Sequence, residues 1–264
     1  MRHGAVVFLL VFLIALASYI SHRPSIRISK VELSGEVLVK EEDIELSTIS
    51  YLNGSYLWLF PKDNAFLYPR NALIKNLKDK FKRIDTIDIH LKNFHILTVD
   101  ITERKPEALW CDSVPNHGGQ MEDGSLSERC YFMDGNSVVF AEAPQFSGDA
   151  YFKYYGLVDT STPIGMQYLA STTLFVQIVN FVDLVKSLSL KPIYIVGKDD
   201  GEFSMMLSTG GQIYFDTKES LSKTSENLKA LMHSPVFSSG AQNNIDYIDL
   251  RFGNKLFYKL KANY

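Results

Sequence analysis

The sequence ITERKPEALW, residues 101–110, places three consecutive charges and a proline between two apolar segments. Proline lacks the backbone N–H that a β-ladder needs, so a strand is expected to end before Pro106. The residues alone leave two readings open. Either one sheet ends at these charges and a second begins at Ala108, or the charged side chains are simply solvated at a strand end. The flanking sequence favours a junction between two modules.

The length and composition suit an ordinary globular protein. The chain has 264 residues, enough for two compact domains, with 46% hydrophobic and 22% charged residues. Its 17 Phe and 14 Tyr favour β-rich structure. The formal net charge of −3 provides no basic field, so we expect no nucleic-acid partner.

The N-terminal segment is apolar enough to reach a membrane. Gly4–Ile20 is a run of 17 uncharged residues, at the short end of what spans a bilayer core. Ala15-Leu16-Ala17 also fits a signal-peptidase site, so residues 1–23 are either a membrane anchor or a cleaved signal peptide. Both alternatives export residues 24–264, which we therefore expect to be extracytoplasmic.

Two cysteines, Cys111 and Cys130, flank a polar segment. An oxidising compartment favours a disulfide between them over two free thiols. Closing a loop of about 20 residues would contribute ~3 kcal/mol to the free energy of unfolding. With only His117 nearby, a tetrahedral ion would lack ligands, so we expect no metal site.

Residues 24–105 predict a first module with two helices. Three acidic residues open the segment 39–50 and suit a first helical turn, with Ile44 and Leu46 expected to pack inward. Residues 69–81 carry apolar side chains three and four positions apart, which indicates one apolar helix face. The segment between the two helices is predicted to be a loop, since it contains Gly54 and Pro61.

Three strands complete this module. Residues 87–92 and 97–102 alternate apolar and polar side chains, which predicts two strands joined by a turn at Asn93. A shorter alternation at 28–33 predicts a first strand. The resulting order is strand, helix, helix, strand, strand, a three-stranded sheet covered by two helices.

Residues 106–264 predict a second, mixed β-sheet module with flanking helices. Its elements are strands at 107–110, a hairpin over 130–140, a helix over 166–188, strands at 192–196, 203–207 and 212–215, a helix ending near 232, and a last hairpin around Gly253-Asn254. Asp134-Gly135 predicts a tight primed turn, and Asp216 or Thr217 is the expected N-cap of the second helix. The fold class is therefore α+β, behind an N-terminal transmembrane helix.

No set of reacting groups suggests catalysis. The six histidines show no metal-binding spacing, and neither a P-loop nor a G-x-S-x-G pattern occurs. Ser220–Lys223 spells S-x-x-K without the motifs that accompany it in enzymes. We therefore expect no enzyme activity, no cofactor and no small-molecule substrate.

Three segments, ITERKPEALW, YFMDGNSVVF and YIDLRFGNKLFYKL, occur in an order and spacing that resemble the FtsQ/DivIB family of bacterial cell-division proteins. The resemblance extends over residues 5–264. It implies a POTRA-like domain over 24–105 and an FtsQ-type β domain over 106–264. The segment that joins Cys111 to Cys130 is not a general feature of the family.

The resemblance also implies a function. Such a protein crosses the bacterial cytoplasmic membrane once, with its C-terminal domains extracytoplasmic, and acts at the division site. It is a non-enzymatic divisome scaffold that links division proteins and helps regulate septal peptidoglycan synthesis. The implied partners resemble FtsB and FtsL, with further division proteins contacting the POTRA-like domain.

A candidate partner-binding site lies in the last hairpin. Arg251 and Phe252 match family positions associated with the FtsB contact, whereas Leu256, Phe257 and Tyr258 follow from an edge-strand argument. A final strand has no later strand to pair with, so a partner strand can add to it.

A three-residue loop, 252–254, gives the predicted register, because it sets Leu250 against Leu256 and Ile248 against Tyr258. Two alternatives remain: residues 262–264 cover this strand, or Phe257 belongs to the core.

The runner-up function is an exported POTRA-bearing module that binds or transports polypeptides. Such a module would continue into repeated POTRA domains or many barrel strands, and neither pattern follows residue 105. A cell-wall hydrolase is a more distant alternative.

Overall fold

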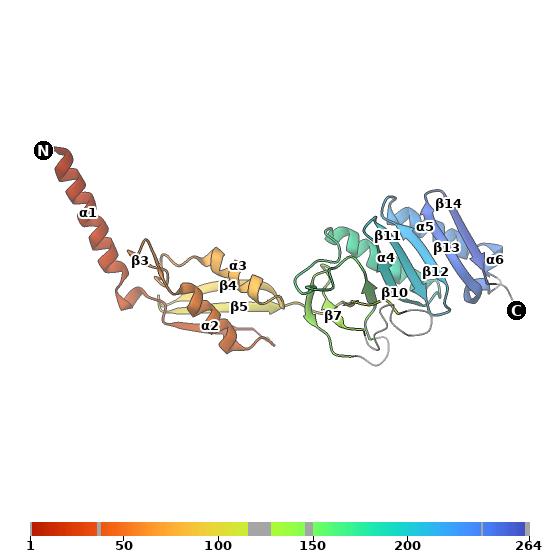
Figure 1. Cartoon of the computed structure of the whole chain (residues 1–264), viewed down its shortest axis with the longest axis horizontal. Helices are drawn as coiled ribbons and strands as arrows, with labels where there is room; N and C mark the ends of the chain where they lie inside the picture. Colours follow the sequence, from red (N-terminus) through yellow and green to blue (C-terminus); the bar gives the residue numbers. More distant parts are fainter. Residues whose placement is uncertain (1, 36–37, 116–127, 146–149, 239, 262–264) are drawn as a thin grey trace. The chain divides into compact units, whose positions relative to one another are not determined.

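A computed structural model describes residues 2–35, 38–115, 128–145, 150–238 and 240–261. The chain divides into two compact units, Met1–Arg104 (unit 1) and Lys105–Tyr264 (unit 2), drawn in Figure 1. Both units mix helices with sheets, so the α+β class is confirmed.

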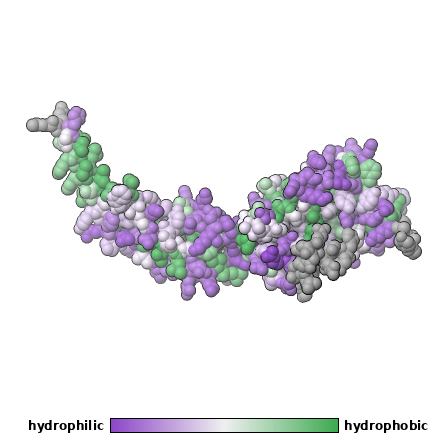
Figure 2. Space-filling model, in the orientation of Figure 1, coloured by the Kyte–Doolittle hydropathy of each residue, from purple (hydrophilic) through white to green (hydrophobic). Residues whose placement is uncertain are grey.

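Helix α1 (Arg2–Ser21) opens unit 1. Its segment His3–Ser21 has a mean hydropathy of 2.5 over a membrane-length window, and it is long and apolar enough to cross a bilayer. Most apolar side chains of this helix are exposed rather than packed against the protein, and Figure 2 shows the helix as a largely hydrophobic segment.

The remaining elements of unit 1 follow the predicted order. They are η1 (Pro24–Ile26), β1 (Lys30–Ser34), α2 (Glu41–Leu52), β2 (Ser55–Tyr56), β3 (Phe60–Pro61), α3 (Arg70–Lys80), β4 (Ile84–Lys92) and β5 (Ile96–Glu103). The sheet order is β1-β5-β4, with β1 parallel and β4 antiparallel to β5. The buried residues of α2 and α3 share one core with this sheet.

Two predictions for unit 1 are wrong in detail. Leu46 is exposed, because two residues turn an α-helix by about 200° and the buried face of α2 is instead set by Ile44, Ser47 and Thr48. The segment predicted as a loop contains the short β2–β3 ladder, which is too brief to show a period in the sequence.

The charged junction is not simply solvated. Glu103 Oε1 accepts hydrogen bonds from the backbone N–H groups of Leu38 and Val39, at 2.7 and 2.8 Å. Arg104 Nε donates to the carbonyl oxygen of Lys82 at 3.1 Å, and its Nη1 lies 3.4 Å from a carboxylate oxygen of Asp85. These two charges hold the segments before α2 and β4, so they close unit 1 where the chain leaves it.

Unit 2 is built on one large sheet. Its elements are β6 (Ala108–Cys111), β7 (Cys130–Met133), β8 (Val139–Glu142), β9 (Lys153–Tyr155), α4 (Thr172–Ser187), β10 (Pro192–Gly197), β11 (Glu202–Leu207), β12 (Gln212–Asp216), α5 (Leu221–Met232), α6 (Pro235–Ser238), η2 (Ala241–Asn244), β13 (Ile245–Phe252) and β14 (Lys255–Leu260). The strand order is β14-β13-β12-β11-β10-β9-β6-β7-β8. Helices α4 and α5 contact each other, and their buried residues join the main core of the sheet.

The sequence missed β9, which lies near the centre of the sheet and is parallel to both neighbours. Three residues are too few for a detectable alternation within a Pro- and Gly-rich stretch. Their strand conformation depends on β6 and β10, which satisfy the backbone groups of β9 on both sides. Tyr154 and Tyr155 are buried on opposite faces of this strand.

Three boundaries in unit 2 differ from prediction. α4 begins at Thr172 rather than 166, because the Ser171 side chain caps it by accepting from Leu174 N–H. Ser220 likewise caps α5, in place of Asp216 or Thr217. The β7–β8 turn is longer than two residues: Asp134 N–H donates to the Val138 carbonyl, and Ser137 takes a positive φ.

Candidate partner-binding site

Strand β14 forms one edge of the nine-stranded sheet of unit 2. It pairs with β13, and within the described residues no strand pairs with its other side. Residues 262–264, which were considered as a cover for this edge, lie outside the described part of the chain. An edge strand of this kind can accept a further strand through its backbone groups.

The register of the last hairpin is partly as predicted. Ile248 lies opposite Tyr258, as expected, but Phe252 pairs with Lys255 across a two-residue turn. A register shift between Asp249 and Phe252 reconciles the two pairings. The three-residue loop is therefore wrong, because an irregularity in β13 supplies the extra residue instead.

The open backbone groups of β14 follow from this pairing. Lys261 N–H donates to the Asn244 carbonyl at 2.7 Å, so Lys261 is directed toward β13. Residues of an antiparallel strand alternate between their two neighbours. Leu256, Tyr258 and Leu260 therefore direct their N–H and C=O groups to the unpaired side. These are the groups that a partner strand would meet.

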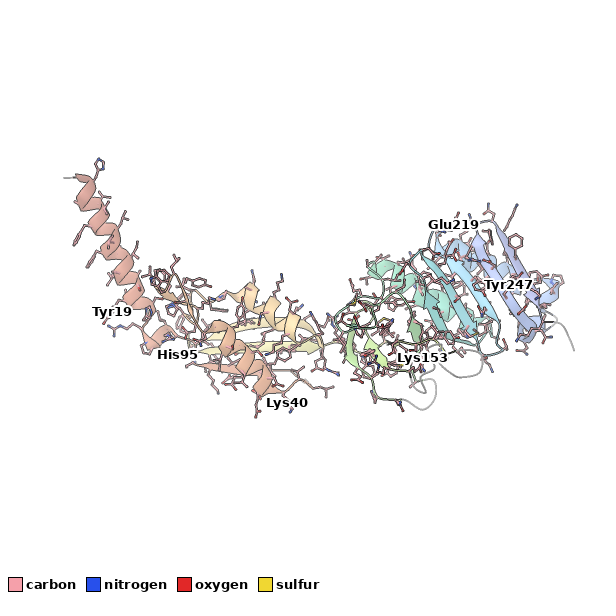
Figure 3. The ribbon with its side chains drawn as sticks, in the orientation of Figure 1. Tyr19, Lys40, His95, Lys153, Glu219 and Tyr247 are labelled. Carbon is pink, nitrogen blue, oxygen red and sulfur yellow. A yellow bond between two sulfur atoms is a disulfide. The ribbon has the colours of Figure 1, made fainter. Side chains whose placement is uncertain are left out.

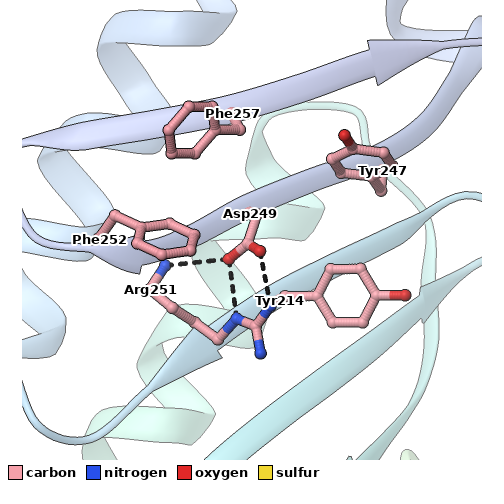
Figure 4. Close-up of a pocket in the computed structure, with 6 residues that line it drawn as sticks. All are labelled: Tyr214, Tyr247, Asp249, Arg251, Phe252 and Phe257. Atoms are coloured by element: carbon pink, nitrogen blue, oxygen red, sulfur yellow. Dashed lines mark hydrogen bonds and ion pairs between the residues drawn. The ribbon is translucent and has the colours of Figure 1, made fainter.

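Arg251 is the centre of an ion-pair cluster beside this edge. Its Nε and Nη2 donate to the two carboxylate oxygens of Asp249, at 2.9 and 2.6 Å, and its Nη1 donates to Glu202 at 2.6 Å. The guanidinium carbon lies 5.3 Å from the centre of the Tyr214 ring. Figure 4 shows the bidentate pair with Asp249 beside Tyr214. Arg251 is therefore held in place by its neighbours before any partner binds.

The two charges of this pair stabilise each other's ionised form. Burial raises the pKa of Asp249, but the hydrogen bonds from Arg251 outweigh that effect and hold the pKa below its ordinary value. The hydrogen bond to Asp249 raises the pKa of Arg251, against a smaller opposing effect of burial.

An aromatic pair completes this face. The rings of Phe252 and Phe257 meet edge to face at 5.1 Å, and both side chains are about half exposed. With Tyr214 and Tyr247 they line an open depression of about 520 Å³ around the ion pair, shown in Figure 4. Aromatic side chains beside a fixed arginine are the residue types that most often dominate binding at interfaces.

The predicted site residues fall on two faces of the hairpin. Arg251, Phe252 and Phe257 line the depression. Leu256 packs against the main core, and the Tyr258 ring meets Phe237 of α6 at 5.3 Å. The side chains of Leu256 and Tyr258 therefore support the hairpin, and only their backbone groups face the unpaired side of β14.

Sequence reasoning did not pair Arg251 with Asp249, and it missed the other residues around the guanidinium. Asp249 and Tyr247 could have been found, because they alternate with Arg251 along β13. Tyr214 and Glu202 come from other strands, and Tyr214 reaches the site because it pairs with Asp249 between β12 and β13. Pairing between strands that are distant in the sequence carries no local signal.

Cys111 and Cys130 form a disulfide, as predicted. The two residues lie directly opposite each other in the β6–β7 ladder. The Glu128 carboxylate lies within 4.8 Å of both sulfur atoms, but its oxygens bind Lys153 and Tyr155. Bonded sulfurs are not thiolates, so this group lacks the ligands that a metal ion requires.

Comparison with known proteins gives no assignment. The chain matches no protein-family model and no curated protein.

Proposed function

We propose that this chain is a single-pass, membrane-anchored scaffold of the bacterial division machinery, similar to FtsQ/DivIB proteins. It is non-enzymatic, and its exported units hold division partners at the septum. The β14 edge captures one partner by β-augmentation, and that partner belongs to the class resembling FtsB and FtsL.

The observation that carries the proposal is the open edge of β14 with its adjoining aromatic and arginine face. The outward backbone groups of Leu256, Tyr258 and Leu260 offer affinity that is independent of sequence. Arg251 and Phe257 lie beside that edge and offer specificity. Helix α1 supports the anchored location, since it is long and apolar enough to cross a membrane.

The direct test compares two substitutions of Tyr258 in the full chain. Tyr258→Pro removes an outward N–H and places a ring at the edge, whereas Tyr258→Ala keeps the N–H. Both variants lose the contact with Phe237, so Tyr258→Ala controls for lost packing. We expect Tyr258→Pro to weaken capture of an FtsB-like coiled-coil segment by at least about tenfold relative to Tyr258→Ala.

The assay is a binding titration alongside thermal unfolding of each variant. Equal affinity of the two Tyr258 variants, at equal melting temperature, would rule out β-augmentation. Phe257→Lys tests the adjoining face in the same titration, and we expect it to weaken binding because it replaces an exposed anchor ring by a charge. Val176→Lys, at an exposed position on α4, is its control and should leave the affinity unchanged.

A further inference from the structure

A second surface in unit 1 has an unusual residue composition. The turn between β2 and β3 carries Leu57 and Trp58 at its tip, with 75% and 87% of their side chains exposed. Phe66 and Phe94 are also exposed, and their rings meet at 5.3 Å. A cluster of exposed, large apolar side chains marks a surface that contacts a membrane or another molecule.

Two turns present three of these residues, Leu57, Trp58 and Phe94, and both turns are conformationally costly. Leu57 and Trp58 both have positive φ, at 48° and 50°, and the turn closes with Leu59 N–H donating to Tyr56. Asn93 and Phe94 repeat the pattern at 55° and 61° in the β4–β5 turn. Consecutive positive φ values favour Asn-Gly and disfavour bulky residues. Bulky apolar residues at these positions are therefore unfavourable twice, because of their positive φ and because of their exposure to water. Their presence points to a role in binding rather than in stabilising the fold.

Polar contacts fix the first turn against the end of α1. Ser18 Oγ donates to the Leu59 carbonyl at 2.7 Å, and Asn64 Nδ2 donates to the Ser21 carbonyl at 3.0 Å. Asn64 and Ser21 are both buried, so this joint is part of the packed structure. The turn therefore moves with the helix.

The same network connects the second turn. Ala65 N–H donates to Ile26, which follows α1, and Asn64 Oδ1 accepts from Phe66 N–H. Phe66 in turn contacts Phe94. Figure 3 shows Tyr19 and His95, which adjoin these residues, at the end of unit 1 from which α1 projects.

The geometry sets the depth of this surface. The segment His3–Ser21 is about 28 Å long at 1.5 Å per residue, close to the thickness of a bilayer core. Ser18 lies about one helical turn before the end of α1, so a turn bonded to it lies at the membrane boundary when α1 spans. Arg23 stacks on the Tyr19 ring at 4.7 Å, and such Tyr and Arg side chains are typical of that boundary.

We propose that Leu57, Trp58, Phe66 and Phe94 form a second membrane contact that inserts at the boundary between lipid headgroups and acyl chains beside α1. The inference rests on the part of the proposed function that places α1 in a bilayer, and it is independent of any partner at β14. Unit 1 would then be held to the lipid surface at two points, α1 and these four side chains. A single membrane helix would leave unit 1 free to rotate about the helix axis.

Tryptophan fluorescence of the full chain in lipid vesicles tests this. Trp58 and Trp110 are the two tryptophans, and Trp110 is buried in the core of unit 2. The Trp58→Phe variant therefore gives the Trp110 background. We expect the Trp58 emission to shift to the blue, to be quenched by lipids brominated near the headgroup, and to be shielded from acrylamide. Quenching by acrylamide alone would overturn the inference, and shielding from both quenchers would do so by showing protein cover.

Two variants keep Trp58 as the reporter. Leu57→Asn and Phe94→Gly introduce residues that positive φ favours, so we expect an equal or higher melting temperature together with a loss of quenching by brominated lipid. Leu38→Asn is the matched control: Leu38 is exposed but binds Glu103, at the opposite end of β5 from the Phe94 turn. Quenching that is unchanged in both turn variants would contradict the inference.

Flotation of the chain with the vesicles separates the two proposals. If the chain floats and Trp58 remains in water, only the second contact fails. If the chain does not float, membrane anchoring fails and the second contact fails with it.

Discussion

Asp249 and Arg251 form a pair whose strength depends on pH. The Asp249 side chain is nearly buried and receives two hydrogen bonds from the guanidinium. Its pKa is held below the ordinary value of 3.8, so the folded state favours the ionised carboxylate more than the unfolded state does. A depressed carboxyl pKa stabilises the fold above that ordinary value, and the contribution is lost as the pH falls through the lowered pKa.

We therefore predict that Asp249→Asn lowers the free energy of unfolding by about 1–3 kcal/mol at neutral pH, since it removes a charged hydrogen-bond partner. The difference from the parent chain should shrink as the pH falls below 3.8 and through the lowered pKa of the parent carboxylate. Denaturant titrations at neutral pH and at a series of acidic pH values measure this. Asp246→Asn is the control, because Asp246 pairs with exposed Lys259 and such pairs contribute about 1 kcal/mol or less.

The pairing of Arg251 also limits what a substitution of Arg251 can test. Arg251→Glu would place three carboxylates together, since Asp249 and Glu202 both bind the guanidinium. That substitution tests the stability of the site more than its binding. Phe257 is half exposed and lies outside the ion-pair cluster, so its substitution separates the effect on binding from the effect on stability better.

Among the elements, the β6–β7 ladder depends on its cross-link. Cys111 and Cys130 close a segment with a sequence separation of 19, and Cys111 lies in a small core with Leu109 and Tyr155. This core is on the face of the sheet opposite Trp110, whose indole N–H donates to Gly156 at 2.9 Å.

Reduction of the disulfide should lower the free energy of unfolding of unit 2 by ~3 kcal/mol, because it frees the closed segment in the unfolded chain. The measurement is the denaturant midpoint with and without a thiol reductant. A chain carrying Cys111→Ala and Cys130→Ala should unfold near the denaturant midpoint of the reduced parent chain. Adding reductant should not change the midpoint of this variant. A parent midpoint that does not move with reductant would contradict this account.

The edge strand β14 shows how an element acquires a role from its neighbours. Its apolar residues alternate imperfectly, with Phe257 exposed between half-buried Leu256 and exposed Tyr258. Helix α6 fixes the side chain of Tyr258, because the Phe237 ring of α6 contacts the Tyr258 ring. The outward side of the β14 backbone pairs with no strand in the described residues.

Over the whole chain, a membrane-competent helix and an open sheet edge belong to different units and lie near opposite ends of the sequence. That organisation would, under the proposed function, let the chain hold a partner at a membrane. Under the proposed function, the location of the chain in dividing cells is the property that best tests the division role.

We predict that a fluorescently tagged chain forms midcell rings in dividing cells of its host. The Tyr258→Pro variant should remain in the membrane, because α1 is intact, but fail to retain its partner at those rings. Microscopy of the tagged chain, with the partner tagged in a second colour, measures both. A uniform envelope signal of the parent chain would contradict the division role.

Local sequence was sufficient for most elements. Period-two alternation found β4 and β5, because their apolar side chains meet the core and alternate with polar ones. Apolar spacing found α3 and α5 for the same reason, and two cysteines with an expected export signal indicated the disulfide. The strands predicted at 192–196, 203–207 and 212–215 match β10, β11 and β12 to within one residue at each end. For these helices and strands, the burial pattern repeats within a few residues.

The rest depended on contacts between distant residues. β9 is a strand because β6 and β10 surround it, and Arg251 is paired because β11 and β12 bring Glu202 and Tyr214 beside it. The joint between Ser18 and Leu59 likewise spans 41 positions. Side chains this far apart meet only after the chain has folded, since the free energy of such contacts comes from packing that no short segment contains.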